Sequence, residues 1–327
     1  MKKIINDTAD IIEEMVSGLT AAYPKLVHRV KDSRVIAKND VKEQVALVSG
    51  GGSGHEPSHA GFVGDGMLSA AVAGDVFTSP TPDQVQIAIN EADQGQGVLL
   101  VVKNYTGDNL NFEMAQEMAE MDDIKAEIVV VDDDIAVENS EFTAGKRGVA
   151  GTILVHKILG DAARNGASLA ELKKLGDEVV PKIKTIGLAL SAATVPEVGK
   201  PGFELAEDEI EFGVGIHGEA GYRREKIQPA KKLAEELVTK ILADYDKKPE
   251  KVGVLVNGMG GTPLMEQFIF MHDVLQLLKD HEVEATFTKV GNYMTSLDME
   301  GVSLTLIDLA DDHLQAALES PVTTIAW

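Results

Sequence analysis

The sequence predicts an α/β protein made of two α/β domains whose sheets are mostly parallel or mixed. First, its 327 residues are 44% hydrophobic and 25% charged, which is enough apolar material for two cores. Second, short continuous apolar runs such as residues 97–102, typical of strands buried on both faces, alternate with amphipathic helical stretches. Third, this alternation restarts after a turn-rich segment at residues 182–200. We therefore place the domains at residues 1–185 and 186–327.

The first domain is expected to open with a helix at residues 8–19, where apolar side chains recur at helical spacing after Asp7 or Thr8 as the N-cap. Polar residues follow its apolar runs, so ligands should collect beyond the carboxyl ends of the strands. The loops after Val48 and Val102 are expected to face one pocket. We expect strands near residues 35–37, 45–48, 67–77, 97–102 and 127–131, and helices within residues 78–92, at 109–121, from the loop 143–152 through Leu159, and at 168–180.

The second domain repeats the habit of strand, glycine turn and helix, without a residue-level repeat of the first. Its first two strand-like runs, TIGLALS and EIEFGVGI, lie on either side of the turn-rich segment. The remaining strands are expected at residues 252–256, 283–290 and 302–307, and the helices at residues 229–245, 263–279 and 311–319.

Composition excludes several classes of function. The chain has no cysteine, which excludes disulfides, thiolate metal sites and cysteine nucleophiles and agrees with a reducing compartment. Its formal net charge of −23 opposes binding to nucleic acid or to an anionic membrane. No signal-peptide pattern and no apolar run of membrane-spanning length is present. We expect a cytoplasmic protein.

The segment SGGGSGHEPSHAG (49–61) is the strongest local signal in the chain. Its glycines allow a turn in which the backbone approaches a ligand closely. If a helix begins here, His55 and His59 share one face. A metal site is the weaker reading, because Pro57 interrupts the pair and no third ligand is evident, so we favour a clamp for a polar substrate and expect no metal. The segment matches neither of the phosphate-binding glycine motifs G-x-x-x-x-G-K-[ST] and G-x-G-x-x-G, so nucleotide phosphate binding is not supported here.

Four further groups of residues are candidates for chemistry. His217 lies between glycines at the end of an expected strand, where its imidazole would have little shielding and could act as base, metal ligand or nucleophile. Lys103 and Asp108 share one loop and could polarise an oxygen and accept a proton, or form a surface ion pair. The run Asp132–Asp134 is expected to be a solvated acidic loop, and residues 257–263 an anion nest or a glycine turn with a Thr N-cap.

Eight blocks, taken in order, resemble the dihydroxyacetone kinase substrate-binding subunit and cover essentially the whole chain. Members of that family hold a ketotriose as a covalent hemiaminal on a histidine, and the block GVGIHGE gives that role to His217. The sequence departs from the family pattern at Ala192-Ala193 and at Ala220, which concerns the rigidity of loops. The blocks are SGGGSGHEP (49–57), DVFTSPTPDQ (75–84), VVKNYTGDNLNFE (101–113), TAGKRGVAGT (143–152), TVPEVGKP (194–201), GVGIHGE (213–219), VNGMGGTPL (256–264) and TSLDMEGVSLTL (295–306).

The resemblance implies roles for further residues. Gly52, Ser53 and Lys103 would hold the oxygens of the substrate, and His55 would hydrogen-bond the bound sugar. Asp108 would also hold the substrate and accept the proton of the hydroxyl that attacks phosphate. An imidazole that adds to a carbonyl discriminates against glycerol, which has none.

The resemblance also implies partners. No nucleotide-binding motif is visible, so ADP and Mg²⁺ are expected on a separate kinase subunit that is recharged by a phosphotransferase-system phosphocarrier. A homodimer is expected from the family. The alternative is a catalytically idle paralogue that binds the same sugar and acts as a transcriptional co-activator. A metal hydrolase built on His55, His59 and His217 is a weaker third hypothesis.

Overall fold

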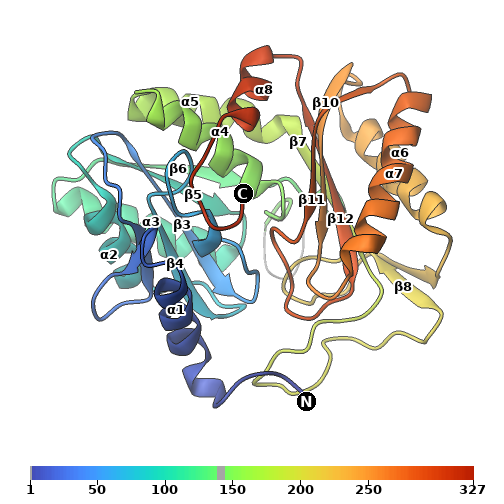
Figure 1. The fold of residues 1–327 in the computed structure, drawn as a ribbon, viewed down its shortest axis with the longest axis horizontal. Coiled ribbons are helices and arrows are strands. Elements are labelled where there is room, and N and C mark those ends of the chain that lie inside the picture. Colours follow the sequence, from blue (N-terminus) through green and yellow to red (C-terminus); the bar gives the residue numbers. More distant parts are fainter. Residues whose placement is uncertain (1, 138–143) are drawn as a thin grey trace.

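The computed structural model describes residues 2–137 and 144–327, which fold into two six-stranded mixed sheets that stand side by side (Figure 1). The α/β prediction with mixed sheets is confirmed. Thr143, the first residue of the TAGKRGVAGT block, lies outside the described residues. The strands are β1 (Val27–Arg29), β2 (Val35–Lys38), β3 (Ala46–Ser53), β4 (Ala70–Val76), β5 (Val98–Lys103), β6 (Ala126–Val131), β7 (Ile183–Ala189), β8 (Glu209–Phe212), β9 (Arg223–Lys226), β10 (Lys251–Gly258), β11 (Glu284–Gly291) and β12 (Gly301–Asp308). The α-helices are α1 (Ile11–Ala22), α2 (Pro82–Ala92), α3 (Thr106–Met121), α4 (Thr152–Arg164), α5 (Leu169–Val179), α6 (Ala230–Asp244), α7 (Leu264–Asp280) and α8 (Asp312–Glu319).

The first sheet has the order β1-β2-β4-β3-β5-β6, and its parallel part is formed by β4, β3, β5 and β6. Strand β5 is buried on both faces: Leu99 and Val101 belong to one hydrophobic cluster, and Val98, Leu100 and Val102 belong to another. Successive side chains of a strand point to opposite faces, which explains the continuous apolar run. The carboxyl ends of β3 and β5 therefore lie next to each other.

The second sheet has the order β11-β10-β12-β7-β8-β9, and only the β10–β11 pair within it is parallel. Helices α6 and α7 cover its outer face, as α2 and α3 cover the outer face of the first sheet (Figure 1). Strand β7 begins at Ile183, so the domain boundary expected between residues 185 and 186 falls within a strand of the second sheet.

A shared hydrophobic cluster joins the two halves between the sheets. Helices α4, α5 and α8 lie in this middle layer, where Leu154 of α4 and Leu314 of α8 belong to the same cluster as Leu99 of β5 and Leu255 of β10 (Figure 1). The last residues return to the first half, where Thr323 N–H donates to the carbonyl of Asp65. No helix among the described residues combines the length and apolar character needed to cross a membrane.

Two local predictions were wrong, and two short strands were not predicted. The glycines at positions 50–52 lie within β3, which continues to Ser53, and no helix follows that would place His55 and His59 on one face. The expected strand at residues 209–216 ends at Phe212, and a loop carries His217. Strands β1 and β9 were not predicted, because each has only three or four residues and β9 reads RREK, without apolar alternation.

Candidate functional site

A hollow of about 390 Å³ lies where the carboxyl ends of β3 and β5 meet the loop after β8. Both halves of the chain contribute to it, and three predicted site residues line it: Gly52, Asp108 and His217. The prediction that the loops after Val48 and Val102 face one pocket is therefore confirmed. The lining residues are Gly52, Phe77, Ser79, Tyr105, Thr106, Gly107, Asp108 and His217.

The imidazole of His217 is packed among three rings. Its centroid lies 4.4 Å from that of Tyr105, 4.8 Å from that of His55 and 5.5 Å from that of Phe77, with interplanar angles of 90°, 78° and 88°. Burial, followed by the nearby His55, Lys103 and Arg147, holds the pKa of His217 well below its usual 6.5. The ring is thus neutral near pH 7, although the expectation that it would have little shielding was wrong.

His55 presents an unused acceptor beside His217. Its Nδ1–H donates to the carbonyl of Thr295 at 2.8 Å, so Nε2 carries the lone pair, and this buried nitrogen has no partner among the described residues. Burial and then the charge of Lys103 lower the pKa of His55 to about 3. His55 also stacks on Phe77, at 5.2 Å between centroids. A hydroxyl placed in the hollow could donate to Nε2.

Lys103 and Asp108 form a buried ion pair, so the surface-pair alternative was wrong. Nζ of Lys103 lies 3.1 Å from Oδ2 of Asp108, and the two side chains are 0% and 5% exposed. Nζ also donates to the carbonyl of Gly50 at 3.4 Å. Gly51 makes room for this lysine, because a Cβ at position 51 would lie 2.3 Å from Nζ. Asp108 belongs to the first turn of α3, whose N-terminal dipole favours a carboxylate there.

Gly52 and Ser53 behave differently although they are neighbours. Gly52 lines the hollow, where a Cβ would lie 2.5 Å from the backbone nitrogen of Thr78. The hydroxyl of Ser53 is buried and donates to the carbonyl of Gly74 at 2.7 Å, which ties β3 to β4. The substrate-binding role of Ser53 stays a prediction.

The comparisons with known proteins decide the family, because the family model described as the Dak1 domain matches residues 17–326. The chain belongs to the Dak1 domain family. It is 62% identical over 328 residues to the "PTS-dependent dihydroxyacetone kinase, dihydroxyacetone-binding subunit DhaK" of Lactococcus lactis subsp. lactis, covering 100% of this chain and 99% of that protein. It is 61% identical to the dihydroxyacetone-binding subunit DhaK of PTS-dependent dihydroxyacetone kinase 1 of Listeria innocua serovar 6a, covering 100% of both chains.

A second kind of Dak1 relative is less similar. The "DhaKLM operon coactivator DhaQ" of Lactococcus lactis subsp. lactis is 43% identical, over 99% of this chain and 100% of that protein. Among solved structures, the "Dihydroxyacetone kinase operon co-activator Dha-DhaQ" matches with a TM-score of 0.92 at 42% identity, covering 96% of this chain and 98% of that one. The native dihydroxyacetone kinase of C. freundii also matches with a TM-score of 0.92, at 34% identity over 100% of this chain and 60% of that one.

The acidic run of this Dak1 chain is mostly buried, contrary to the prediction of a solvated loop. Asp133 and Asp134 are each 1% exposed. Asp133 accepts hydrogen bonds from the backbone of Val149 and Gly151, both at 2.8 Å, while burial raises its pKa to about 6. Asp134 pairs with the buried Arg147, whose Nε donates at 2.7 Å. These carboxylates brace the loop before α4 rather than face solvent.

His59 does not join the site. Its Nδ1 lies 2.9 Å from Nε2 of His156, a residue of α4, and both rings are buried. The two motif histidines therefore point to different partners, which gives no support to a metal centre built from His55, His59 and His217. Within residues 2–137 and 144–327, no group of three or more His, Asp or Glu side chains is arranged to hold a metal ion.

The glycine turn at residues 257–263 is structural. Asn257 Oδ1 accepts from the backbone of Tyr293 at 2.8 Å and of Met294 at 2.9 Å, which fixes the loop that follows β11. Thr262 does not cap α7, because its hydroxyl bonds to the backbone of Gly301, and Pro263 occupies the N-cap position. The alternative with a Thr N-cap was therefore wrong.

From the sequence, no role was assigned to several residues around the hollow. Phe77 and Tyr105 pack on His217, and Arg147 and Glu219 lie behind it. All four lie within quoted blocks, but only their contacts in the structure show their roles. The 72 positions between Arg147 and Glu219 hide their contact from local pattern analysis.

Proposed function

We propose that this chain is the dihydroxyacetone-binding subunit of a phosphotransferase-system-dependent dihydroxyacetone kinase, as its relatives at 61–62% identity are named. One observation carries the proposal: a neutral imidazole and the carboxylate of a buried ion pair line a single hollow, and an imidazole with an unused acceptor packs directly on the first imidazole. His217 supplies the nucleophile, His55 the acceptor, and Lys103 with Asp108 the pair.

His217 attacks the carbonyl carbon of the ketotriose through the ring nitrogen that carries the lone pair. A C–N bond forms, the C=O π bond breaks, and the oxygen takes the electron pair. The imidazole then loses its N–H proton and the former carbonyl oxygen gains one, which gives a neutral hemiaminal without loss of water. A low pKa suits this role, because a protonated imidazole has no lone pair for the attack.

His55 and the ion pair orient the bound ketotriose. Nε2 of His55 accepts a hydrogen bond from a substrate hydroxyl, since Nδ1 is already committed to Thr295. Asp108 accepts the proton of the terminal hydroxyl as that oxygen attacks phosphorus, and the ammonium of Lys103 balances the carboxylate charge. Gly52 leaves space for the sugar next to the backbone.

The phosphoryl group comes from a partner subunit that carries ADP and Mg²⁺ and is itself recharged by a phosphocarrier. The eight residues that line the hollow include no lysine or arginine, and the net charge of −23 repels free nucleotide. The partner therefore brings the positive charge and docks over the mouth of the hollow. Purified protein with dihydroxyacetone, Mg²⁺ and ATP should form no appreciable dihydroxyacetone phosphate until that partner is added.

Intact-protein mass spectrometry with dihydroxyacetone tests the binding chemistry. A hemiaminal adds the full mass of one ketotriose, whereas a Schiff base on the buried Lys103 would add that mass less one water. Glycerol should add nothing because it lacks a carbonyl. An unchanged protein mass at saturating dihydroxyacetone, or an increment short by one water, would contradict the proposal.

The co-activator role is the second candidate, supported by the relation to DhaQ at 43% identity. It is less well supported, because identity to the kinase subunits reaches 62% over the whole chain. Phosphate transfer to the bound ketotriose in the presence of the ADP-carrying subunit separates the two functions.

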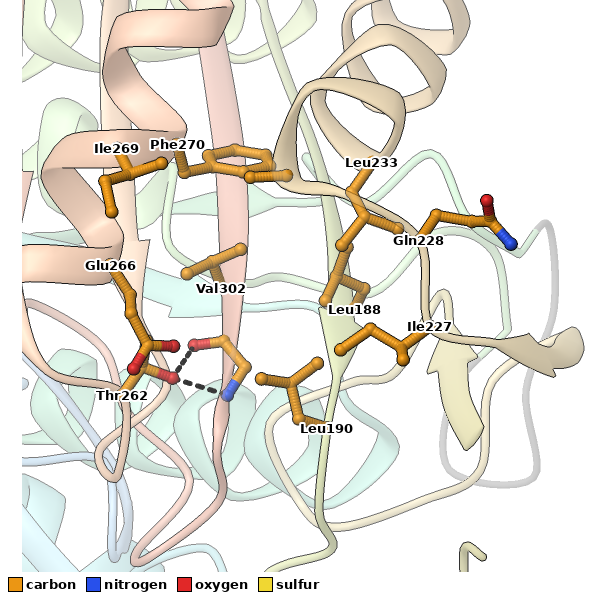
Figure 2. Close-up of a pocket in the computed structure, with 12 residues that line it drawn as sticks. Leu188, Leu190, Ile227, Gln228, Leu233, Thr262, Glu266, Ile269, Phe270 and Val302 are labelled. Carbon is orange, nitrogen blue, oxygen red and sulfur yellow. Dashed lines mark hydrogen bonds between the residues drawn. The ribbon is translucent and has the colours of Figure 1, made fainter. Parts of the chain in front are cut away.

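A homodimer through α7 is part of the proposal. Exposed apolar side chains gather on the first turns of this helix, beside an apolar hollow of about 190 Å³ between α6 and α7 (Figure 2). Protruding side chains next to a hollow on one surface suit a two-fold interface, because the side chains of each copy can enter the hollow of the other. Sedimentation analysis should show a dimer that Phe268→Glu converts to a monomer. The exposed residues are Leu264, Met265, Phe268 and Ile269 on α7, together with Ile227 before α6.

A cytoplasmic location completes the proposal. It agrees with the absence of cysteine from the sequence and with a phosphotransferase-system partner. Fractionation of cells that produce the protein is the direct test.

A further inference from the structure

Arg147 is a buried cation that reaches from the first half of the chain to the loop that carries His217. Its side chain is 1% exposed. On its own side, Nε donates to Oδ2 of Asp134 at 2.7 Å. Across the interface, Nη2 donates to the carbonyl of Gly213 at 2.8 Å and Nη1 to Oε1 of Glu219 at 3.1 Å. Such a forked side chain fixes the direction of every group that it contacts.

Glu219 passes this constraint to His217. Its Oε2 accepts the backbone N–H of His217 at 2.8 Å, while Oε1 is held by Arg147. One carboxylate thus joins the guanidinium of the first half to the backbone of the proposed nucleophile. Asp134 anchors the other end, because its Oδ1 also accepts the backbone N–H of Ala136 at 2.9 Å.

The ring of His217 depends on this backbone anchor. Among residues 2–137 and 144–327, no hydrogen bond restrains either of its ring nitrogens, and its ring contacts are those with Tyr105, His55 and Phe77. Packing against these rings limits the tilt of the His217 imidazole but still allows it to shift in its own plane. The position of the His217 backbone determines where the imidazole lies. The distance from the attacking nitrogen to a substrate held by His55 is therefore set by Glu219.

We propose that Arg147 and Glu219 are positioning residues that hold His217 at the attack distance, so the site is complete only when the two halves are joined. The inference rests on the proposed function of His217. Neither residue touches the hollow, and both act through the backbone. Arg147 pairs with two carboxylates, those of Asp134 and Glu219. A neutral side chain at position 219 therefore leaves Arg147 paired with Asp134 and creates no unpaired charge.

Glu219→Gln is the direct test. The amide keeps the shape of the side chain, but its NH₂ group must face either Arg147 or the N–H of His217, and one of these contacts is lost. A displacement of the nucleophile by about 1 Å lowers reactivity by roughly 100-fold. We expect the dihydroxyacetone concentration for half-maximal adduct to rise by about 10- to 100-fold, with the upper value corresponding to a displacement of about 1 Å. Glu236→Gln is the matched control, since Glu236 pairs with Arg223 in the same half, away from the hollow.

A second readout separates positioning from a general loss of fold. In ligand-free protein, the imidazole ¹⁵N resonances of His217 should shift or broaden in Glu219→Gln, while those of the buried His156 stay unchanged. This measurement needs no substrate, so it tests the clamp even if the wild-type protein forms no adduct, a result that would contradict the proposed function alone.

The proposal is overturned if Glu219→Gln matches the wild type both in its adduct titration and in its His217 resonances. It is also overturned if Glu236→Gln produces the same loss. Should Glu219→Gln not fold, Glu219→Asp replaces it, because the shorter side chain keeps the charge for Arg147 but withdraws the acceptor from His217. The same rise in half-maximal concentration is expected, and wild-type behaviour of this variant would count against the clamp.

Discussion

Two pairs of neutral imidazoles lie in this structure, and only one of them is placed for chemistry. His217 lines a hollow and His55 packs on its ring, with Nε2 of His55 lacking a partner among the described residues. His59 and His156 contact one another at 2.9 Å in the interior, where both rings are buried and line no part of this hollow, although Nε2 of His59 and Nδ1 of His156 also lack a partner among the described residues. Burial is the first cause of the lowered pKa in all four. Neither a depressed pKa nor an uncommitted ring nitrogen therefore identifies a reactive histidine; access to a hollow does.

The largest expected effect is on His217. We predict that His217→Ala abolishes the ketotriose adduct, because no other nucleophile replaces the imidazole. His156→Ala is the contrasting variant and should keep the adduct while losing stability, since it leaves Nδ1 of His59 with only a long 3.4 Å contact to the hydroxyl of Ser49. Intact mass and urea unfolding of both variants provide the measurement. An adduct of full ketotriose mass on His217→Ala would erase the distinction between the pairs.

Asp108 should show the next largest effect. Asp108→Asn is expected to retain the adduct but to slow phosphoryl transfer by roughly 100- to 10,000-fold, the range for loss of a general base. The measurement is the rate of dihydroxyacetone phosphate formation with the ADP-carrying partner present. Turnover within a few-fold of the wild type would remove Asp108 from the mechanism.

His55 should have a smaller effect, because it orients the substrate without bonding to it covalently. We predict that His55→Ala raises the dihydroxyacetone concentration for half-maximal adduct by about 10-fold, as expected for one lost hydrogen bond of about 1.4 kcal/mol. His59→Ala should leave that concentration unchanged. If His59→Ala weakened the adduct as much as His55→Ala, the contrast between the two pairs would fail.

A lower pH should reduce the stability of the fold through both histidine pairs, and it should have little effect on adduct formation. Below pH 6.5 the unfolded chain protonates these four histidines while the folded protein keeps them neutral, because His55 and His156 have a folded pKa of about 3 and the folded pKa values of His59 and His217 lie well below 6.5. The unfolded state then binds more protons, so each histidine lowers the free energy of unfolding by about 1.4 kcal/mol per pH unit. Asp133 opposes this between about pH 6 and 3.8, because its raised pKa favours the folded state there as the pH falls.

Urea unfolding at pH 7 and pH 5 checks the sign of this effect. Stability should fall on acidification, and adduct formation by the folded protein should stay constant over the same range. A marked loss of adduct near pH 6.5 without unfolding would show that the site imidazoles titrate normally.

The sequence predicted what depends on local order. The apolar run of β5 and the polar residues after it indicated a buried strand with a site at its end, and Lys103 and Asp108 do pair across five positions. It could not predict contacts between distant segments: His59 meets His156 across 97 positions, and Arg147 meets Glu219 across 72. Such contacts follow from the packing of whole layers, and no local periodicity encodes them.

Burial of charge was the other limit. Three consecutive aspartates suggest solvent exposure, yet Asp133 and Asp134 are buried because backbone amides and Arg147 satisfy them. The glycines of β3 misled for a related reason. They suggested a turn, whereas Gly51 stays in the strand and its missing side chain gives Lys103 its place.

The return of the final residues to the first sheet affects how the protein is made. Thr323 binds Asp65, and the N–H groups of Ile325 and Ala326 donate to the carbonyl of Gly61. During synthesis, the segment around Gly61 and Asp65 therefore lacks these partners until residues 323–326 have left the ribosome. The surface around Gly61 stays uncovered in the meantime, open to a chaperone or to an improper partner. The two halves are thus separate sheets in space but a single unit in the order of folding.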